Sequence, residues 1–233
     1  MSKVSFLTQL KELKTVLPGM SPTDRVKHLW TYYKWLIPVV LALVVLVSII
    51  LTGITNRNKV VSIGGVAVNV PFSEAGEQYL HEDYMAHEDM NPKKYSVMFS
   101  ETYIRTMENA TNFQDNYYSL MGLLALCSSK QVDYLIVDVE GGSVLVKQDA
   151  FLDLRLIYTQ EELDAFGDKV IWMENSEMGE ATPIMLDITD MPFIQDNATI
   201  KDKVLFGFVS NSPRIDQAKE MLEYMQAWKS PAA

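Results

Sequence analysis

The sequence predicts an α/β domain that is preceded by a single membrane-spanning helix. Strand-like and helix-like segments alternate along residues 56–233, which is typical of a layered α/β domain. The run DYLIVDV at 133–139 is apolar enough for a strand that is buried on both faces, as in a parallel sheet. An uncharged apolar stretch from Trp35 to Ile54 comes before this domain. We therefore expect a three-layer domain with a largely parallel sheet.

The segments of the α/β domain follow from their residue patterns. The run 60–68 is rich in β-branched residues, 95–103 alternates like a half-buried strand, and 113–127 is a strongly apolar helix. Pro71 precedes a helical pattern that starts at Ser73. The expected strands are 60–68, 95–103, 133–139, 169–173, 183–188 and 203–209, and the expected helices are 73–86, 113–127, 142–148, 160–166 and 213–228.

The apolar stretch from Trp35 to Ile54 is predicted to be a transmembrane helix. At about 1.5 Å per residue it would span about 30 Å, the thickness of the hydrocarbon core of a bilayer. A cleaved signal peptide fits poorly because the run starts late, and a buried core helix would show one polar face. We expect one helix from about Pro22 to Ile54, anchored between Trp35 and Ile54, with a possible kink at Pro38.

Charge is distributed unevenly along the chain. Residues 1–34 carry six Lys/Arg against Glu12 and Asp24, whereas residues 55–233 carry 14 Lys/Arg against 28 Asp/Glu. The positive-inside rule then predicts a single-pass protein of the cell membrane, with a cytoplasmic N-terminus and the C-terminal domain outside. The acidic domain argues against nucleic-acid binding, which needs a basic surface.

The chain divides into three predicted parts. Residues 1–20 form an amphipathic cytoplasmic arm, 21–55 a juxtamembrane and transmembrane helix, and 56–233 the extracytoplasmic α/β domain. The arm can lie on the lipid bilayer or bind a partner. Its apolar positions are Leu7, Leu10, Leu13 and Leu17.

A candidate ligand site follows the buried strand at 133–139. Ligands of open α/β sheets bind at the carboxyl ends of parallel strands, where a helix N-terminus can receive an anion. The two carboxylates beside this turn would repel an anion, so a cationic or hydroxylated ligand fits the site better. The alternative is an ordinary strand-to-helix turn in which Ser143 or an acid caps the helix. Glu101, Asp187 and Asp190 would join this edge if the fold brings them near. The candidate residues are Asp138, Glu140, Gly141, Gly142 and Ser143.

No catalytic or cofactor-binding motif is apparent in the sequence. It contains no Gly-rich phosphate loop, no G-x-S-x-G elbow and no HExxH motif. Cys127 lies in the apolar run LMGLLALC and is expected to be a buried core thiol. We therefore expect no enzyme activity, no cofactor and no metal site.

The stretch HEDYMAHED at 81–89 repeats His-Glu-Asp six residues apart. Residues six apart on an α-helix lie about 240° apart around its axis, so His81 and His87 would not share one metal ion. Among the His, Glu and Asp residues of this stretch, only Asp83 and His87 are four residues apart, so they are the only close pair with some potential to bind a metal. We interpret the stretch as a solvated acidic helix end.

Several motifs resemble the extracellular solute-binding proteins of ABC importers. Val137-Asp138-Val139 is similar to the end of a strand in that family, and Ala150-Phe151-Leu152-Asp153-Leu154 to a later segment. The segments 182–187 and 205–225 are similar to the family's return strand and to a strand–turn–helix stretch. Tyr32-Tyr33-Lys34-Trp35 resembles the YYKW motif of single-pass proteins from clostridia-like bacteria.

The resemblance implies one lobe of a periplasmic-binding-protein type II fold. The domain is long enough for one lobe, whereas the family closes two lobes on its ligand. The expected function is therefore a non-enzymatic, membrane-tethered recognition or scaffold module, with an ABC transporter permease or another membrane protein as partner. The alternatives are small-solute binding by the single lobe, and a sensor that signals through its cytoplasmic arm.

Overall fold

The computed structural model describes residues 21, 23, 36–57, 60–106, 108–109, 112–174, 181–199 and 201–230. The chain divides into two compact units, Met1–Asn58 and Lys59–Ala233. The predicted arm with Leu7, Leu10, Leu13 and Leu17 lies outside the described residues, as does Trp35.

In the first unit, helix α3 spans Leu36–Arg57. Of the helices in the described parts of the chain, none is long and apolar enough to cross a membrane. The predicted transmembrane helix is therefore wrong, together with the single-pass topology and the cell-membrane localisation that rested on it.

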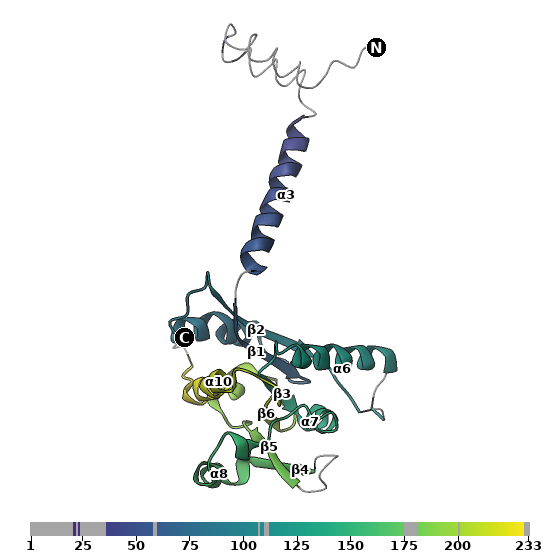
Figure 1. Ribbon diagram of the computed structural model, residues 1–233, viewed down its shortest axis with the longest axis vertical. Helices are drawn as coiled ribbons and strands as arrows, with labels where there is room; N and C mark the ends of the chain where they lie inside the picture. Colours follow the sequence, from purple (N-terminus) through teal and green to yellow (C-terminus); the bar gives the residue numbers. More distant parts are fainter. Residues whose placement is uncertain are drawn as a thin grey trace. The chain divides into compact units, whose positions relative to one another are not determined.

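The second unit is built on one mixed sheet of six strands in the order β2-β1-β3-β6-β5-β4 (Figure 1). Strand β1 is parallel to β2 and β3, whereas the pairs β3–β6, β5–β6 and β4–β5 are antiparallel. The expectation of a largely parallel sheet is therefore wrong. A fully buried strand reads alike in either direction, so the buried run of β3 does not reveal its antiparallel neighbour. The strands are β1 Val60–Val68, β2 Tyr95–Thr102, β3 Tyr134–Asp138, β4 Val170–Glu174, β5 Ala181–Asp187 and β6 Val204–Phe208.

Most helices lie where the sequence pattern places them. The helix expected at 73–86 is divided into α4, a π-helical turn η2 and α5, and the short helix α9 was not expected because its six residues are too few for a periodic pattern. The helical elements of the domain are α4 Glu74–Gln78, η2 Tyr79–Asp83, α5 Tyr84–His87, α6 Phe113–Ser128, α7 Val139–Val146, η3 Leu154–Leu156, α8 Gln160–Phe166, η4 Gly167–Lys169, α9 Pro192–Asn197 and α10 Ile215–Ala227.

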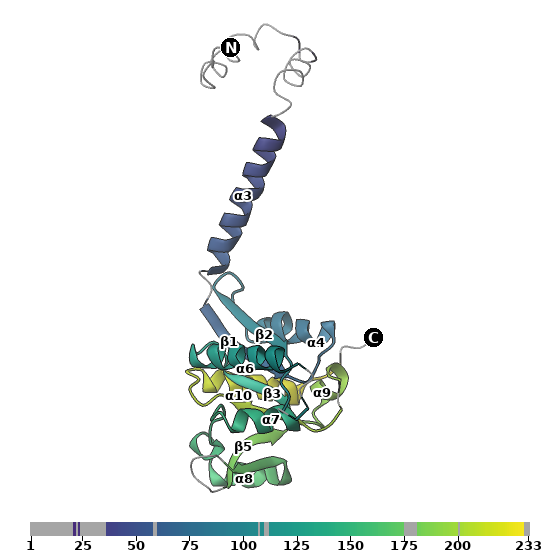
Figure 2. The same ribbon diagram turned by 90° about the vertical axis from the view of Figure 1, so that its right-hand side faces the viewer.

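Two apolar clusters cover the two faces of the sheet. On one face, β1 and β3 pack against η2, α5, α9 and α10 through residues such as Leu80, Phe193 and Met221. On the other face, α6 and α7 contribute Leu123, Cys127 and Leu145. Figures 1 and 2 show helices on both sides of the sheet, so this unit is a layered α/β domain.

A buried carboxylate ties β1, β3 and the start of α10 together. Asp133 is fully buried and accepts hydrogen bonds from the Gly64 amide at 2.7 Å and the Ser212 hydroxyl at 2.6 Å. Arg214 Nε donates to the same carboxylate at 2.9 Å. Because a buried charge needs full compensation, this network defines how α10 begins relative to the sheet.

Candidate functional site

The carboxyl ends of β1, β2, β3 and β5 meet at one edge of the sheet, where β6 and β4 begin. The pairs Val68–Thr102, Val68–Val137, Asp138–Val204 and Asp187–Leu205 in the strand register define this edge. A pocket of about 250 Å³ opens there. Its polar lining residues are Asn69, Tyr103, Arg105, Asp138, Glu140, Thr199, Lys201, Asp202 and Lys203.

Asp138 caps helix α7 and holds the neighbouring loop. Its Oδ1 accepts from the Gly141 amide at 2.7 Å and from Asn69 Nδ2 at 2.9 Å. Asn69 has a positive φ of 61° and also exchanges hydrogen bonds with the backbone of Ile104. A Cβ at Gly141 would lie 2.9 Å from Val68 Cγ1 and 3.0 Å from Asp138 Oδ1, so this close approach requires glycine. Asp138 is therefore the N-cap of α7, which agrees with the predicted alternative that an acid caps this helix.

Glu140 is enclosed by donors from the loop that follows β2. Its carboxylate accepts from Arg105 Nη1 at 3.0 Å, from the Thr106 amide at 2.9 Å and hydroxyl at 3.0 Å, and from Asn109 Nδ2 at 2.9 Å. Burial raises the pKa of Glu140, but these hydrogen bonds outweigh it and lower the pKa to about 2. Glu140 is a permanently ionised carboxylate at neutral pH that fixes the loop.

The other predicted site residues have separate surroundings. Gly141 and Gly142 are buried within α7, and the Ser143 hydroxyl donates to the Glu140 carbonyl at 2.7 Å instead of capping the helix. None of these three lines the pocket. Glu101 accepts from the Phe72 amide at 2.6 Å.

Asp187 does reach the carboxyl edge, as the sequence allowed. Lys203 Nζ lies 2.9 Å from its Oδ2, and the Thr189 hydroxyl donates at 2.6 Å. Burial opposes ionisation of Asp187, yet the hydrogen bonds from Thr189 and Lys203 lower its pKa. The carboxylates Asp138, Glu140 and Asp187 are therefore all occupied by donors of the domain itself.

No reactive group is apparent at this edge. Within the described residues, no cluster of three or more His, Cys, Asp or Glu side chains has a geometry that would hold a metal ion. Cys127 is buried in the core, where burial raises the pKa of its thiol to about 11.

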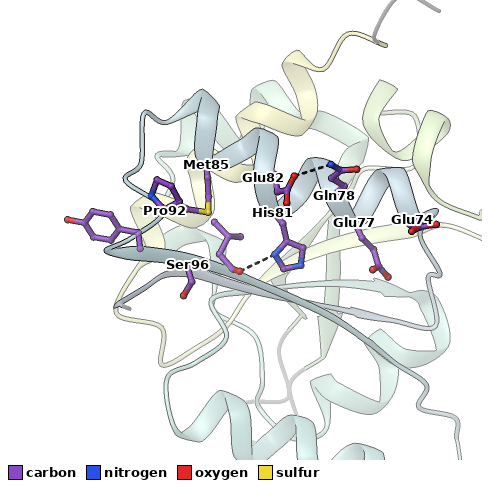
Figure 3. Close-up of a pocket in the computed structure, with 10 residues that line it drawn as sticks. Glu74, Glu77, Gln78, His81, Glu82, Met85, Pro92 and Ser96 are labelled. Atoms are coloured by element: carbon purple, nitrogen blue, oxygen red, sulfur yellow. Dashed lines mark hydrogen bonds between the residues drawn. The ribbon is translucent and has the colours of Figure 1, made fainter. Parts of the chain in front are cut away.

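A larger groove, here called the β2 groove, lies between the α4–η2 segment and β2 (Figure 3). Its volume is about 600 Å³. Three exposed glutamates line it, Glu74, Glu77 and Glu82, and the described ion pairs involve none of them. The other lining residues are Gln78, His81, Met85, Pro92, Tyr95, Ser96 and Val97.

The π-helical turn η2 directs His81 into this groove. A π-helix has about one extra residue per turn, and such turns are frequent at functional sites. His81 Nδ1 lies 3.0 Å from the Val97 carbonyl oxygen of β2, and its ring contacts Phe99 edge-on at 6.4 Å. Figure 3 shows His81 lying between the helix and the strand, with Gln78 bonded to Glu82 beside it.

The two histidines of HEDYMAHED lie on different surfaces of the domain. His81 lines the β2 groove, whereas the ring of His87 contacts Tyr224 at 5.3 Å and its Nε2 lies 3.7 Å from Glu88. The sequence repeat drew attention to this helix but not to Glu74 and Glu77. Glu74 and Glu77 lie seven and four residues before His81, and this spacing is the sequence signal that the three side chains share the helix face along the groove.

No protein-family model matches this chain, and neither the curated proteins nor the solved structures include a significant match. The resemblance to one lobe of a solute-binding protein therefore stays a prediction.

Proposed function

We propose that the Lys59–Ala233 domain is a non-enzymatic recognition module that binds a partner macromolecule in the β2 groove. The observation that carries this proposal is the difference in hydrogen bonding between two groups of carboxylates. Those at the carboxyl edge are held by internal donors, whereas Glu74, Glu77 and Glu82 line an open groove. Charged groups that the domain does not use itself remain available to a partner.

The size of the carboxyl-edge pocket and the setting of the β2 groove support the same choice. Pockets that enclose a small ligand usually measure about 300–1,000 Å³ and are mostly apolar with a few convergent polar groups. The carboxyl-edge pocket, at about 250 Å³, falls below this range. The β2 groove, at about 600 Å³, borders an edge strand and two turns of helix, which suits an extended protein segment.

A site-specific photo-crosslinker tests the proposal in cells that make the full chain. The crosslinking residue replaces Gln78 or Ser96 in the groove, and Glu161 on the exposed face of α8 serves as the matched control. We expect a discrete adduct from both groove positions and none from the control. Equal labelling at all three positions, or none in the groove, would contradict the proposal. Mass spectrometry of the adduct identifies the partner, and the resemblance makes an ABC-transporter subunit the first candidate.

Small-solute binding is the second candidate function. The lining of the carboxyl-edge pocket carries both signs of charge, with Lys201 and Lys203 beside Asp138 and Asp202 among its residues, which suits a small zwitterion. A thermal-shift screen of amino acids tests this alternative. A stabilising ligand whose effect disappears in Lys201→Ala, but is kept in the control Lys169→Ala, would favour it over the groove.

A further inference from the structure

We propose that the partner of the β2 groove is an extended basic segment that adds to the sheet as a new strand beside β2. This inference rests on the proposed function and specifies the class of partner. In strand addition, main-chain hydrogen bonds supply affinity, and grooves for alternate side chains supply specificity.

The first observation is the free edge of β2. Strand β2 is at the end of the sheet and pairs, in the described residues, with β1 alone. The Lys94 and Thr102 carbonyls accept from the Val60 and Asn69 amides, so even-numbered residues direct their main-chain groups to β1. Odd-numbered residues then direct theirs away from the sheet, because main-chain groups alternate along a strand. The residues that face outward are Val97, Phe99 and Glu101, together with Tyr95, whose amide donates to the Asn91 carbonyl at 3.0 Å.

The contact of His81 with β2 indicates that the outward carbonyl of Val97 needs a hydrogen-bond donor. The Val97 carbonyl faces outward, and the His81 imidazole lies 3.0 Å from its oxygen, where the amide of an added strand would lie (Figure 3). Proteins protect exposed edges so that they do not pair at random. His81 is partly exposed and sits on a π-helical turn, so an incoming amide can replace it.

Grooves border β2 on both faces of the sheet. The β2 groove lies on the α4–η2 side at Tyr95, Ser96 and Val97. A second groove of about 240 Å³ lies on the α6 side at Ser100 and Thr102, with Tyr118, Leu123 and Leu126 among its other lining residues. Side chains of an added strand alternate between these two sides. One set meets the acidic β2 groove. The other meets a groove of mixed lining, in which Val66, Leu123 and Leu126 are apolar and Glu101 and Ser119 are polar.

The negative charge of the β2 groove indicates which kind of segment binds there. The β2 groove is lined by Glu74, Glu77 and Glu82 and contains no Lys or Arg, so it complements a segment with basic residues at every second position. A second copy of this chain is disfavoured as the occupant, because β2 itself carries Glu101 and no basic residue. An alternation of basic and apolar residues satisfies both grooves.

The test uses the full chain and a fluorescent, end-capped octapeptide of alternating Lys and Val. We expect fluorescence anisotropy to show saturable binding that weakens about tenfold in E74Q/E77Q/E82Q, since three exposed charge pairs are lost. The control variant E161Q/D168N/E174Q removes the same net charge from exposed positions on and near α8 and β4, and binding should be unchanged. Equal weakening in both variants would show nonspecific attraction and overturn the proposal.

Backbone methylation separates strand addition from other binding. In one peptide the Lys amides are N-methylated, and in a second the Val amides are. Because alternate amides face the same side, only one peptide keeps the amides that pair with β2, so one should bind normally and the other at least tenfold more weakly. Equal affinities, or no binding of the parent peptide, would overturn strand addition. A groove-specific crosslink with a failed peptide would overturn this inference and leave the proposed function standing.

Discussion

Three carboxylates at the carboxyl edge and the three that line the β2 groove have opposite surroundings. Asp138, Glu140 and Asp187 accept hydrogen bonds from donors as far as 69 residues away in sequence. In the β2 groove, the Gln78 amide donates to Glu82 at 3.0 Å. Among the described residues, this is the side-chain hydrogen bond that the groove glutamates accept. Carboxylates of the first kind stabilise the fold, and those of the second kind remain available to a partner.

This comparison explains why the acidic composition of the domain is a poor guide to its sites. The strand end at Asp138 has the residue types expected of a ligand site, and its acids serve as a helix cap and a loop clamp. The helix at 74–83 reads as a wet acidic surface, yet it borders the larger groove. The presence or absence of nearby donors decides between these roles.

The largest expected effect comes from removing Asp133, the carboxylate that is fully buried and hydrogen-bonded to three donors. Asp133→Ala leaves Arg214 unpaired in a partly buried position and removes the acceptor for Gly64 and Ser212. Loss of one partner of a buried pair should lower the free energy of unfolding by about 3–5 kcal/mol. Urea denaturation followed by circular dichroism measures the change. A decrease in the free energy of unfolding of less than about 1 kcal/mol would contradict the idea that carboxylates with internal hydrogen bonds stabilise the fold.

A pair of glycine substitutions sharpens the comparison at the carboxyl edge. Gly141→Ala brings a methyl group within 3.0 Å of Asp138 Oδ1 and should destabilise the domain by about 1–3 kcal/mol. Gly122 on α6 is the matched control because its added Cβ meets no atom within 4 Å, and Gly122→Ala should stabilise by about 0.5–1 kcal/mol. Thermal unfolding of both variants measures the difference, and equal effects would argue against tight packing at Asp138.

The loop clamp at Glu140 predicts a pH dependence of stability. Its folded pKa is about 2, below the ordinary value of 4.5, so its ionisation stabilises the fold above about pH 4.5. That contribution is lost as the pH falls from about 4.5 to 2. Glu140→Gln should lower stability at pH 7 by about 1–2 kcal/mol and flatten the acid limb of the profile. Unfolding free energies between pH 2 and 7 measure this, and a parallel, unflattened profile would contradict it.

The smallest expected effect belongs to the β2 groove. E74Q/E77Q/E82Q should change the free energy of unfolding by no more than about 0.5 kcal/mol, because exposed acids outside ion-pair networks contribute little to stability. Urea denaturation at pH 7 measures the change, with E161Q/D168N/E174Q as the charge-matched control. A loss comparable to that of Glu140→Gln would show that the groove acids support the fold and would remove the contrast between the two regions.

Local pattern alone was enough to predict most elements of the domain. The β-branched run at 60–68 is β1, the alternation at 95–103 is β2, and the helix expected at 160–166 is α8. These patterns depend on residues within one or two turns of each other, so they are visible in the chain itself. The apolar stretch before the domain was misleading in this respect, because the transmembrane helix that it predicted is contradicted.

The tertiary structure alone decided the strand order, the π-helical turn and the use of each acid. Strand β6 enters between β3 and β5 and runs antiparallel to both, and no local pattern specifies that position. His81 meets the Val97 carbonyl only because η2 packs over β2, and Glu140 meets Arg105 only because the loop after β2 reaches α7. The sequence by itself determined which residues are acidic and where most of the helices and strands of the domain form. Which acids are engaged depends on donors brought close by the fold, since hydrogen bonds act over about 3 Å whatever the separation in sequence.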